Sequence, residues 1–322
     1  MVSGVPKLFD NNIKIHFAGS DGQENFHAAL AAAGTRYRLY SCYKFIVNKQ
    51  VGGDFHLPEN HVIRAEDREN RHVIQDSGLF TLMFGKGRGQ RQTRETLTQW
   101  QDKLIAFVEQ NRIMATCVEI DCQKVLGVED AWYFRERMRR RLKNPQINVF
   151  HFEDGRRGLD RLIDFSSYIA LSIPELRIIK PKTFREDTRY LAGYIKNRKP
   201  EIDIHLLGCT DMKIIAQNRF CTSADSTSWL AGVKFGYFDD GVQKAHIRHF
   251  RRDIVARRRV EVQAVLDRRG VTLTEKGMEH TTNASIWAVA NTCPIKPYLT
   301  TPLAVSFPHI SPMMSVQRKV TA

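Results

Sequence analysis

The sequence predicts a single-domain (β/α)8 TIM-type barrel, an α/β fold in which eight parallel strands alternate with helices. Two observations carry this prediction: eight short apolar segments recur along residues 13–225, and amphipathic segments separate most of them. Strands that alternate with helices form a parallel sheet, and eight such units close into a barrel. A doubly wound open sheet is the alternative, but no G-x-G-x-x-G motif follows the first apolar segment.

The expected strands are apolar runs, most of which end at an acidic residue or a glycine. They cover residues 13–19, 38–45, 72–78, 114–121, 147–153, 168–173, 202–208 and 219–225. The expected helices carry apolar residues at helical spacing and cover residues 95–110, 130–142, 156–165, 182–197, 210–218, 241–268 and 275–291. We expect the barrel to span residues 1–293. Residues 294–322, rich in Pro, Ser and Thr, are expected to form an irregular C-terminal extension.

The chain is strongly basic. Lys and Arg outnumber Asp and Glu by 49 to 35, which gives a formal net charge of +14. Clustered positive charge of this size favours a polyanionic partner such as a nucleic acid, although a merely basic soluble protein has the same composition. No apolar run reaches the length of a membrane span, and the N-terminus lacks the apolar core of a signal peptide. The six cysteines include no C-x-x-C pair, so we expect a reduced, cytoplasmic protein without a cysteine zinc site.

Carboxylates gather where the expected strands end. In a barrel these ends converge on the face that holds the active site, where acidic groups are costly unless they are paired or do chemistry. Each could instead cap the following helix, and for two of them, each followed by Ser, capping explains the residue as well as chemistry does. Two facing carboxylates suit glycosidic bond chemistry. The acidic residues are Asp76, Asp121, Glu153, Asp154, Glu175 and Asp225.

Four short segments carry a resemblance to a known family. "QDSGLF" (75–80) resembles the DSGGF/Y motif of tRNA-guanine transglycosylases, which are (β/α)8 barrels. "VEIDCQ" (118–123), "HLLGCT" (205–210) and "CTSADSTSW" (221–229) resemble further segments of that family in the same order. The closer resemblance is to the phage branch that acts on DNA, the DNA 7-deazaguanine transglycosylases.

This resemblance implies a role for each matching residue. Asp225 would be the nucleophile at C1′ of a guanine nucleotide, and Asp76 the general acid and base. Asp121 would accept hydrogen bonds from the N1–H and amino group of guanine, because a carboxylate accepts from two adjacent donors. The residues expected to bind the base are Asp121, Ser77, Phe80, Gly208 and Glu153. The partners implied are DNA and a free 7-deazaguanine base, with no redox cofactor and no ATP.

Two departures from the family bear on the substrate. The tRNA enzymes carry a C-x-C-x-x-C zinc site that supports tRNA docking, and no such cluster follows Asp225, so we expect no metal. Glu153 stands where the family has a glutamine, so the base would be read differently there. A tRNA substrate, a glycosylase that lets water finish the reaction, and a non-catalytic nucleic-acid-binding barrel are the alternatives. The oligomeric state is open.

Three basic segments are candidates for phosphate contacts. "GKGRGQRQTR" (85–94) follows Asp76 directly, and its alternate glycines let the backbone approach a ligand. Residues 135–143 and 246–259 add two arginine-rich helical segments, although a run of charge is more often a solvated face. The predicted contacts are Lys86, Arg88, Arg91, Arg139, Arg140, Arg251 and Arg252. Three histidines, His151, His205 and His249, are interpreted as structural.

Overall fold

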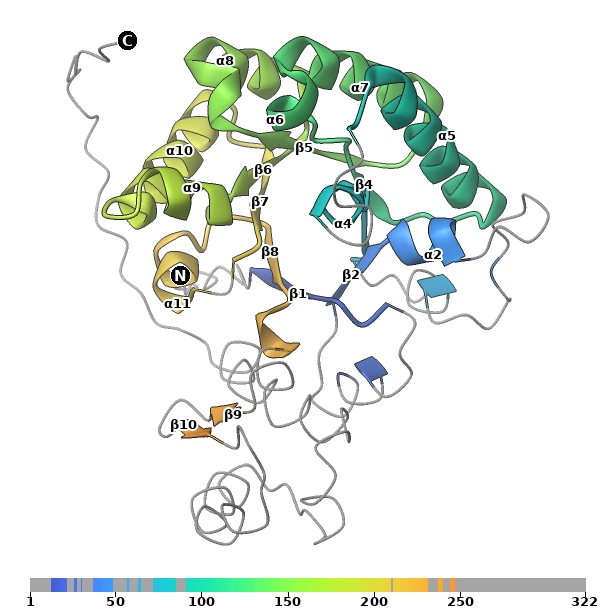
Figure 1. Ribbon diagram of the computed structural model, residues 1–322. Helices are drawn as coiled ribbons and strands as arrows, with labels where there is room; N and C mark the ends of the chain where they lie inside the picture. The colour runs from blue at the N-terminus through green and yellow to red at the C-terminus, as the bar shows by residue number, and fades with distance from the viewer. Residues whose placement is uncertain are drawn as a thin grey trace, which may run out of the picture.

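The fold is that of a closed parallel barrel, seen in a computed structural model (Figure 1). The structure describes residues 13–21, 26–27, 30, 37–48, 57, 63–64, 72–84, 91–209, 211–230, 237–239 and 244–246. Strands β1 to β8 pair in sequence order, and β8 pairs back onto β1, which confirms the predicted (β/α)8 architecture. The strands are β1 Lys14–Ala18, β2 Tyr37–Ser41, β3 Ile74–Asp76, β4 Thr116–Val118, β5 Gln146–Phe150, β6 Tyr168–Ser172, β7 Asp203–Leu207 and β8 Ser223–Ser226.

Five of the expected helices are present with ends shifted by one or two residues. They are α5 Arg94–Gln110, α7 Val128–Arg141, α8 Gly155–Phe165, α10 Phe184–Arg198 and α11 Met212–Gln217. Helices α5, α7, α8 and α10 lie outside the ring of strands (Figure 1). The shorter helical segments are α2 Tyr43–Asn48, α4 Leu79–Phe84, α6 Gln123–Leu126, α9 Ile173–Ile179, η1 Phe152–Asp154 and η2 Ser228–Leu230.

Two sequence expectations need correction. Residues 43–45, expected to end the second strand, begin helix α2 instead, because β2 ends at the mouth of the barrel and the chain turns there. Lys244–His246, expected within the helix 241–268, form strand β10, which pairs antiparallel with β9, Tyr237–Asp239. The rest of 241–268, the helix 275–291 and the extension 294–322 lie outside the described residues.

Apolar side chains fill much of the barrel interior and the layer between strands and helices. The interior layer comes from strands alone and includes Ala18, Leu39, Ile74, Val118, Ile147, Val149, Tyr168 and Ala170. Outside the strands, the inner face of α5 buries Leu97, Leu104, Ile105 and Val108 against its neighbours, and its N-terminus is capped by Thr93. Thr93 accepts from the Thr96 backbone N–H in a capping box, which stabilises the start of the helix.

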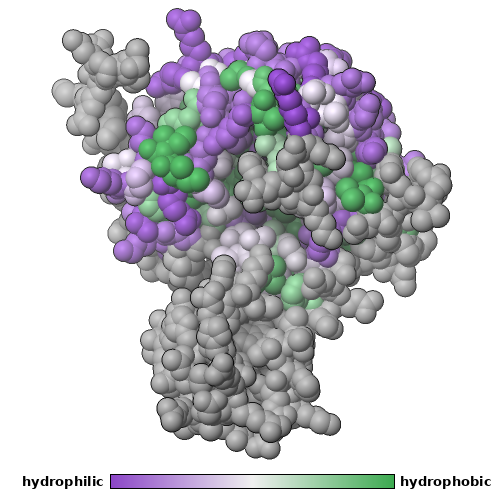
Figure 2. All heavy atoms as spheres, viewed as in Figure 1, coloured by the Kyte–Doolittle hydropathy of each residue, from purple (hydrophilic) through white to green (hydrophobic). Residues whose placement is uncertain are grey.

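Chain direction fixes which ends of the helices lie near the mouth. In a parallel barrel each helix begins near the C-terminal end of one strand and ends near the N-terminal end of the next. The last turn of α7 therefore lies at the face opposite the mouth, just before β5. Hydrophilic residues cover most of the helical part of the face seen in Figure 2. None of the helices in the described ranges has the length and apolar character that crossing a membrane requires.

Candidate functional site

Asp76 ends strand β3 at the mouth of the barrel. Its Oδ2 accepts a hydrogen bond from the Gly78 backbone N–H at 2.9 Å, in a turn where Gly78 has φ +74°. Burial and, after it, the negative charges of Asp121, Asp225 and Asp21 raise the pKa of Asp76 to about 7, against the lowering effect of the Gly78 hydrogen bond. Carboxylates from different strand ends therefore lie within electrostatic reach of one another. Asp76 can hold or release a proton near neutral pH.

Asp225 lies on β8, with 7% of its surface exposed. Its Oδ1 accepts two hydrogen bonds, from His205 Nε2 at 3.0 Å and from the Gly208 backbone N–H at 2.7 Å. Within the described part of the chain, Oδ2 receives none. Two N–H donors on one oxygen stabilise the carboxylate and fix its orientation, which leaves the second oxygen free to react.

A line of hydrogen bonds runs from Asp225 into the barrel. His205 Nδ1 lies 2.5 Å from Ser223 Oγ, which lies 2.5 Å from the Tyr168 hydroxyl. Burial raises the pKa of Tyr168 well above its usual value, so this hydroxyl stays protonated and can donate a hydrogen bond to Ser223 Oγ. Ser223 can then donate to Nδ1, which leaves the His205 proton on Nε2, pointing at Asp225. In this arrangement each hydrogen bond of the line has one donor and one acceptor.

A second histidine, His151, lies beside Asp121 at the end of β5. His151 Nδ1 is 2.6 Å from Glu175 Oε2, and its Nε2 is 3.4 Å from Asp121 Oδ2. Lys124 pairs with the other oxygen of Glu175 at 3.1 Å. Burial alone would lower the pKa of His151, but the two carboxylates raise it to about 10. The imidazole is therefore charged at neutral pH and lies between two acids.

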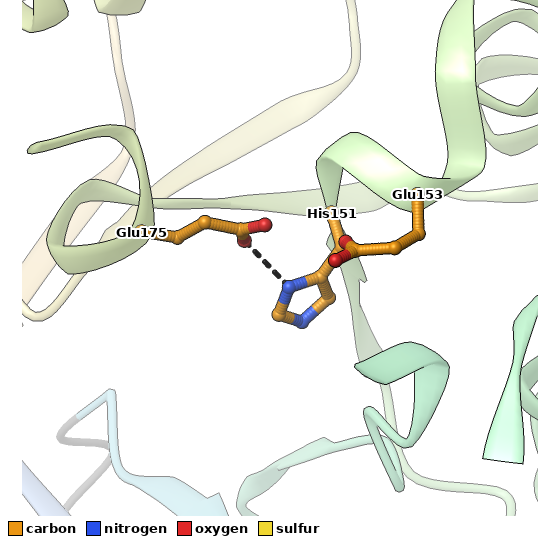
Figure 3. Close-up of side chains that lie close together, drawn as sticks. All are labelled: His151, Glu153 and Glu175. Carbon is orange, nitrogen blue, oxygen red and sulfur yellow. Dashed lines mark hydrogen bonds and ion pairs between the residues drawn. The ribbon is translucent and has the colours of Figure 1, made fainter. Parts of the chain in front are cut away.

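Glu153 and Glu175 bring carboxylates to the same imidazole (Figure 3). His151, Glu153 and Glu175 each offer one ligand atom, and these atoms lie within 4.8 Å of one another. Glu153 comes from η1 and is exposed, whereas Glu175 comes from α9 and is buried. A nitrogen and two carboxylate oxygens are a donor set that a divalent cation accepts. In the structure the His151 imidazole bonds to Glu175 directly.

A buried ion-pair network supports this side of the mouth. Arg135 of α7 and Glu119 are both fully buried, and the Arg135 Nε donates to both Glu119 oxygens at 2.9 and 2.8 Å. Arg135 Nη1 also lies 3.4 Å from Asp154 Oδ1, and Asp154 Oδ2 accepts the His151 backbone N–H at 3.0 Å. The network therefore links helix α7 to the loop that carries His151.

The predicted base-binding residues divide between the mouth and its support. Asp121 and Gly208 lie at the mouth, in contact with His151 and Asp225. Phe80 is 73% exposed in the first turn of α4. Ser77 is buried, and its backbone carbonyl accepts hydrogen bonds from Trp100 Nε1 and Cys42 Sγ, both at 2.9 Å. These two bonds anchor the turn that follows β3. Glu153 points its carboxylate toward His151 (Figure 3).

The predicted phosphate-binding residues are dispersed. Arg91 precedes α5 on the mouth side, and a pocket of about 140 Å³ is lined by Arg91, Trp100 and Lys103 among others. Arg139 and Arg140 lie in the last turn of α7, opposite the mouth, so a phosphate beside Asp225 is out of their reach. There Arg139 donates to the Phe165 carbonyl at 2.9 Å. Arg140 pairs with Glu136 at 3.8 Å. The other four, Lys86, Arg88, Arg251 and Arg252, lie outside the described residues.

Three residues at the site were not among the predicted site residues. His205 and His151 are interpreted as structural from sequence, and the structure places each of them against a candidate carboxylate. Asp21 follows β1, is buried, and has a pKa raised to about 6 by burial. The available signal was position: each histidine lies on or at the end of an apolar strand, where a polar side chain needs a partner.

Comparison of the sequence with models of protein families gave no match, and no curated protein matches the chain.

Proposed function

We propose that the chain is a base-exchange transglycosylase that replaces guanine in DNA with a 7-deazaguanine derivative. The observation that carries the proposal is the group of carboxylates at one barrel mouth. Asp225 has one oxygen held by two donors, whereas Asp76 has a pKa raised to about 7. Two carboxyl groups in different hydrogen-bonding surroundings divide naturally into a nucleophile and a proton carrier.

The first half-reaction removes guanine. Asp225 Oδ2 attacks C1′ of the nucleotide and forms a glycosyl ester as the bond from C1′ to N9 breaks. Protonated Asp76 gives its proton to the departing base, so guanine leaves neutral and Asp76 becomes a carboxylate. The DNA strand remains intact because neither sugar–phosphate bond is broken.

The second half-reaction installs the new base. A free 7-deazaguanine base enters the same pocket and gives its N9 proton to Asp76. N9 then attacks C1′, the ester bond to Asp225 breaks, and both acids return to their starting forms. No electron acceptor and no nucleoside triphosphate enters this balance.

The rest of the site fits a flipped nucleotide. Asp121 is half-buried beside Asp76 and can accept from two adjacent N–H groups of the base. Phe80 is an exposed aromatic at the mouth, and stacking on a base contributes about 1–3 kcal/mol. The net charge of +14 supports a nucleic-acid substrate. Arg91 is the phosphate contact that we retain among the described residues.

A guanine-release assay tests the proposal. Duplex DNA carrying radiolabelled guanine is incubated with the protein, with and without unlabelled 7-deazaguanine, and release of label is followed. We expect release beyond one equivalent of protein to require both the added base and Asp225, with Asp225→Asn inactive. Release of many equivalents without added base would indicate a glycosylase, and release only from a parallel tRNA sample would move the substrate to tRNA. Tight DNA binding without release would leave a non-catalytic barrel.

A further inference from the structure

We propose that His151 selects the base, by donating its Nε2–H to a ring carbonyl while Asp121 accepts from the neighbouring ring N–H. This inference rests on the proposed function and adds the residue that sets base specificity. The ligand class is a purine or deazapurine with a lactam edge, in which C6=O and N1–H lie side by side.

The contact with Glu175 fixes the proton on Nδ1. Nδ1 lies 2.6 Å from Glu175 Oε2, and an ionised carboxylate only accepts hydrogen bonds. Glu175 is buried, and its other oxygen is neutralised by Lys124 at 3.1 Å. Glu175 is therefore committed to His151 Nδ1 and Lys124, and it aims the opposite ring edge of His151 at Asp121.

The other ring nitrogen has an unmet hydrogen-bonding requirement. Nε2 of His151 is buried and has no hydrogen-bond partner among the described residues, although Asp121 Oδ2 lies 3.4 Å away. A bare lone pair facing a carboxylate at that distance would be repelled, so Nε2 carries a proton. Asp121 supplies charge at this distance but no hydrogen bond, and a ligand oxygen placed beside Asp121 would complete the hydrogen bonding of the buried N–H.

The adjacent donor and acceptor match one edge of guanine. A lactam presents C=O to His151 and N–H to Asp121, so both contacts are complementary. A base with an amino group at C6 reverses this pattern, because its N–H groups face His151 and its bare ring nitrogen faces Asp121. A site with polar groups placed for one pattern rejects the reversed pattern strongly.

Glu153 joins His151 and Glu175 in a set that could instead hold a cation. Direct bonding between His151 and Glu175 and the ammonium group of Lys124 on Glu175 favour a proton over a metal, because each occupies a lone pair that a cation would need. The test therefore includes the metal content of the protein.

The experiment measures binding of free bases by calorimetry, independently of exchange. The probes are 7-deazaguanine and 2,6-diamino-7-deazapurine, which differ at the lactam edge. We expect the wild-type protein to prefer 7-deazaguanine by about tenfold or more. His151→Leu should abolish most of that preference, and His151→Gln, which keeps an N–H donor, should restore part of it. Glu175→Gln serves as a second variant that leaves the imidazole in place and weakens its orientation.

Two results would overturn the inference while leaving the transglycosylase proposal intact. One is an unchanged preference for 7-deazaguanine in His151→Leu and Glu175→Gln. The other is one equivalent of bound metal in the wild-type protein, detected by inductively coupled plasma mass spectrometry and lost in His151→Leu. If the wild-type protein binds neither base and releases no guanine from nucleic acid, both the proposed function and this inference are contradicted.

Discussion

His205 Nε2 lies 3.0 Å from Asp225 Oδ1, and the Gly208 backbone N–H donates to the same oxygen at 2.7 Å. His205 is the middle residue of β7 and Gly208 directly follows that strand, which is the neighbour of β8 in the barrel. Because they occupy one oxygen, the other oxygen of Asp225 is the one that would attack the sugar in the proposed reaction. The pairing of β7 with β8 thus sets which atom of the carboxylate can react.

Replacing His205 tests this relationship. His205→Phe removes the Nε2 donor, and we expect the guanine-exchange rate to fall about 100-fold, the usual cost of losing one aligned donor at a reacting centre. His205→Gln should recover part of the rate through its side-chain N–H, with KM for DNA little changed. His72→Gln is the matched control, since His72 bonds to His16 and not to Asp225. Equal rates for His205→Phe and His72→Gln would contradict the prediction.

The raised pKa of Asp76 predicts a pH-dependent stability. The folded protein favours neutral Asp76, so this group contributes stability that is present below pH 3.8 and is lost as pH rises through about 7. Asp76→Asn removes that dependence and can still accept the Gly78 N–H. We therefore expect the variant to match the wild type at pH 4 and to exceed it by on the order of 2 kcal/mol at pH 8.

Denaturant unfolding at the two pH values measures this difference. Asp164→Asn, on the exposed face of α8, is the control and should change stability little at either pH. A difference for Asp76→Asn that is the same at pH 4 and pH 8 would mean that Asp76 does not titrate between them.

Gly208 is placed where a side chain does not fit. Its φ is +67°, and an added Cβ would lie 2.8 Å from Pro174 Cγ. Gly208→Ala should therefore lower stability by about 1–2 kcal/mol and reduce exchange by moving the N–H away from Asp225. Gly193→Ala, in α10 with open space around it, should instead stabilise the protein by about 0.5–1 kcal/mol. Thermal unfolding of both variants measures the contrast, and equal shifts would contradict it.

The buried pair of Arg135 and Glu119 should dominate the stability of its side of the barrel. Arg135→Met leaves Glu119 buried without its partner, and we expect a loss of about 3–5 kcal/mol in unfolding free energy. Arg139→Met, at an exposed position on the same helix, should cost less than about 1 kcal/mol. A small loss for Arg135→Met would indicate that Glu119 is readily protonated or solvated.

The eight strands could be predicted because each contains a short apolar run, and most of the predicted runs end at an acidic residue or a glycine. The partners of polar residues could not, because they depend on which strands become neighbours. His205 meets Asp225 only because β7 pairs with β8, and His151 meets Asp121 because β5 follows β4 in the barrel. Sequence periodicity predicts which residues share one face of a strand, but it does not predict which side chain of a neighbouring strand they contact.

Charge runs were the least informative pattern. Arg139 and Arg140 looked like phosphate contacts, yet chain direction places them at the end of α7, opposite the mouth. That placement follows from the alternation of strands and helices, because each helix of a parallel barrel ends at the face opposite the mouth. The predicted helix direction alone therefore puts Arg139 and Arg140 on a different face from Arg91. Lys244–His246 belong to a segment predicted to be helical from its apolar spacing, but they pair as a strand, because local spacing does not contain information about an antiparallel partner.

The most direct test of the central claim is to trap the glycosyl ester on Asp225. The protein is mixed with end-labelled guanine-containing DNA without any incoming base, denatured, and resolved by gel electrophoresis, with Asp225→Asn alongside. The account predicts a labelled protein–DNA adduct in the wild type that disappears when 7-deazaguanine is added before denaturation, and no adduct in the variant. An adduct of equal yield in Asp225→Asn, or guanine release by the wild type with no adduct at any time, would contradict it.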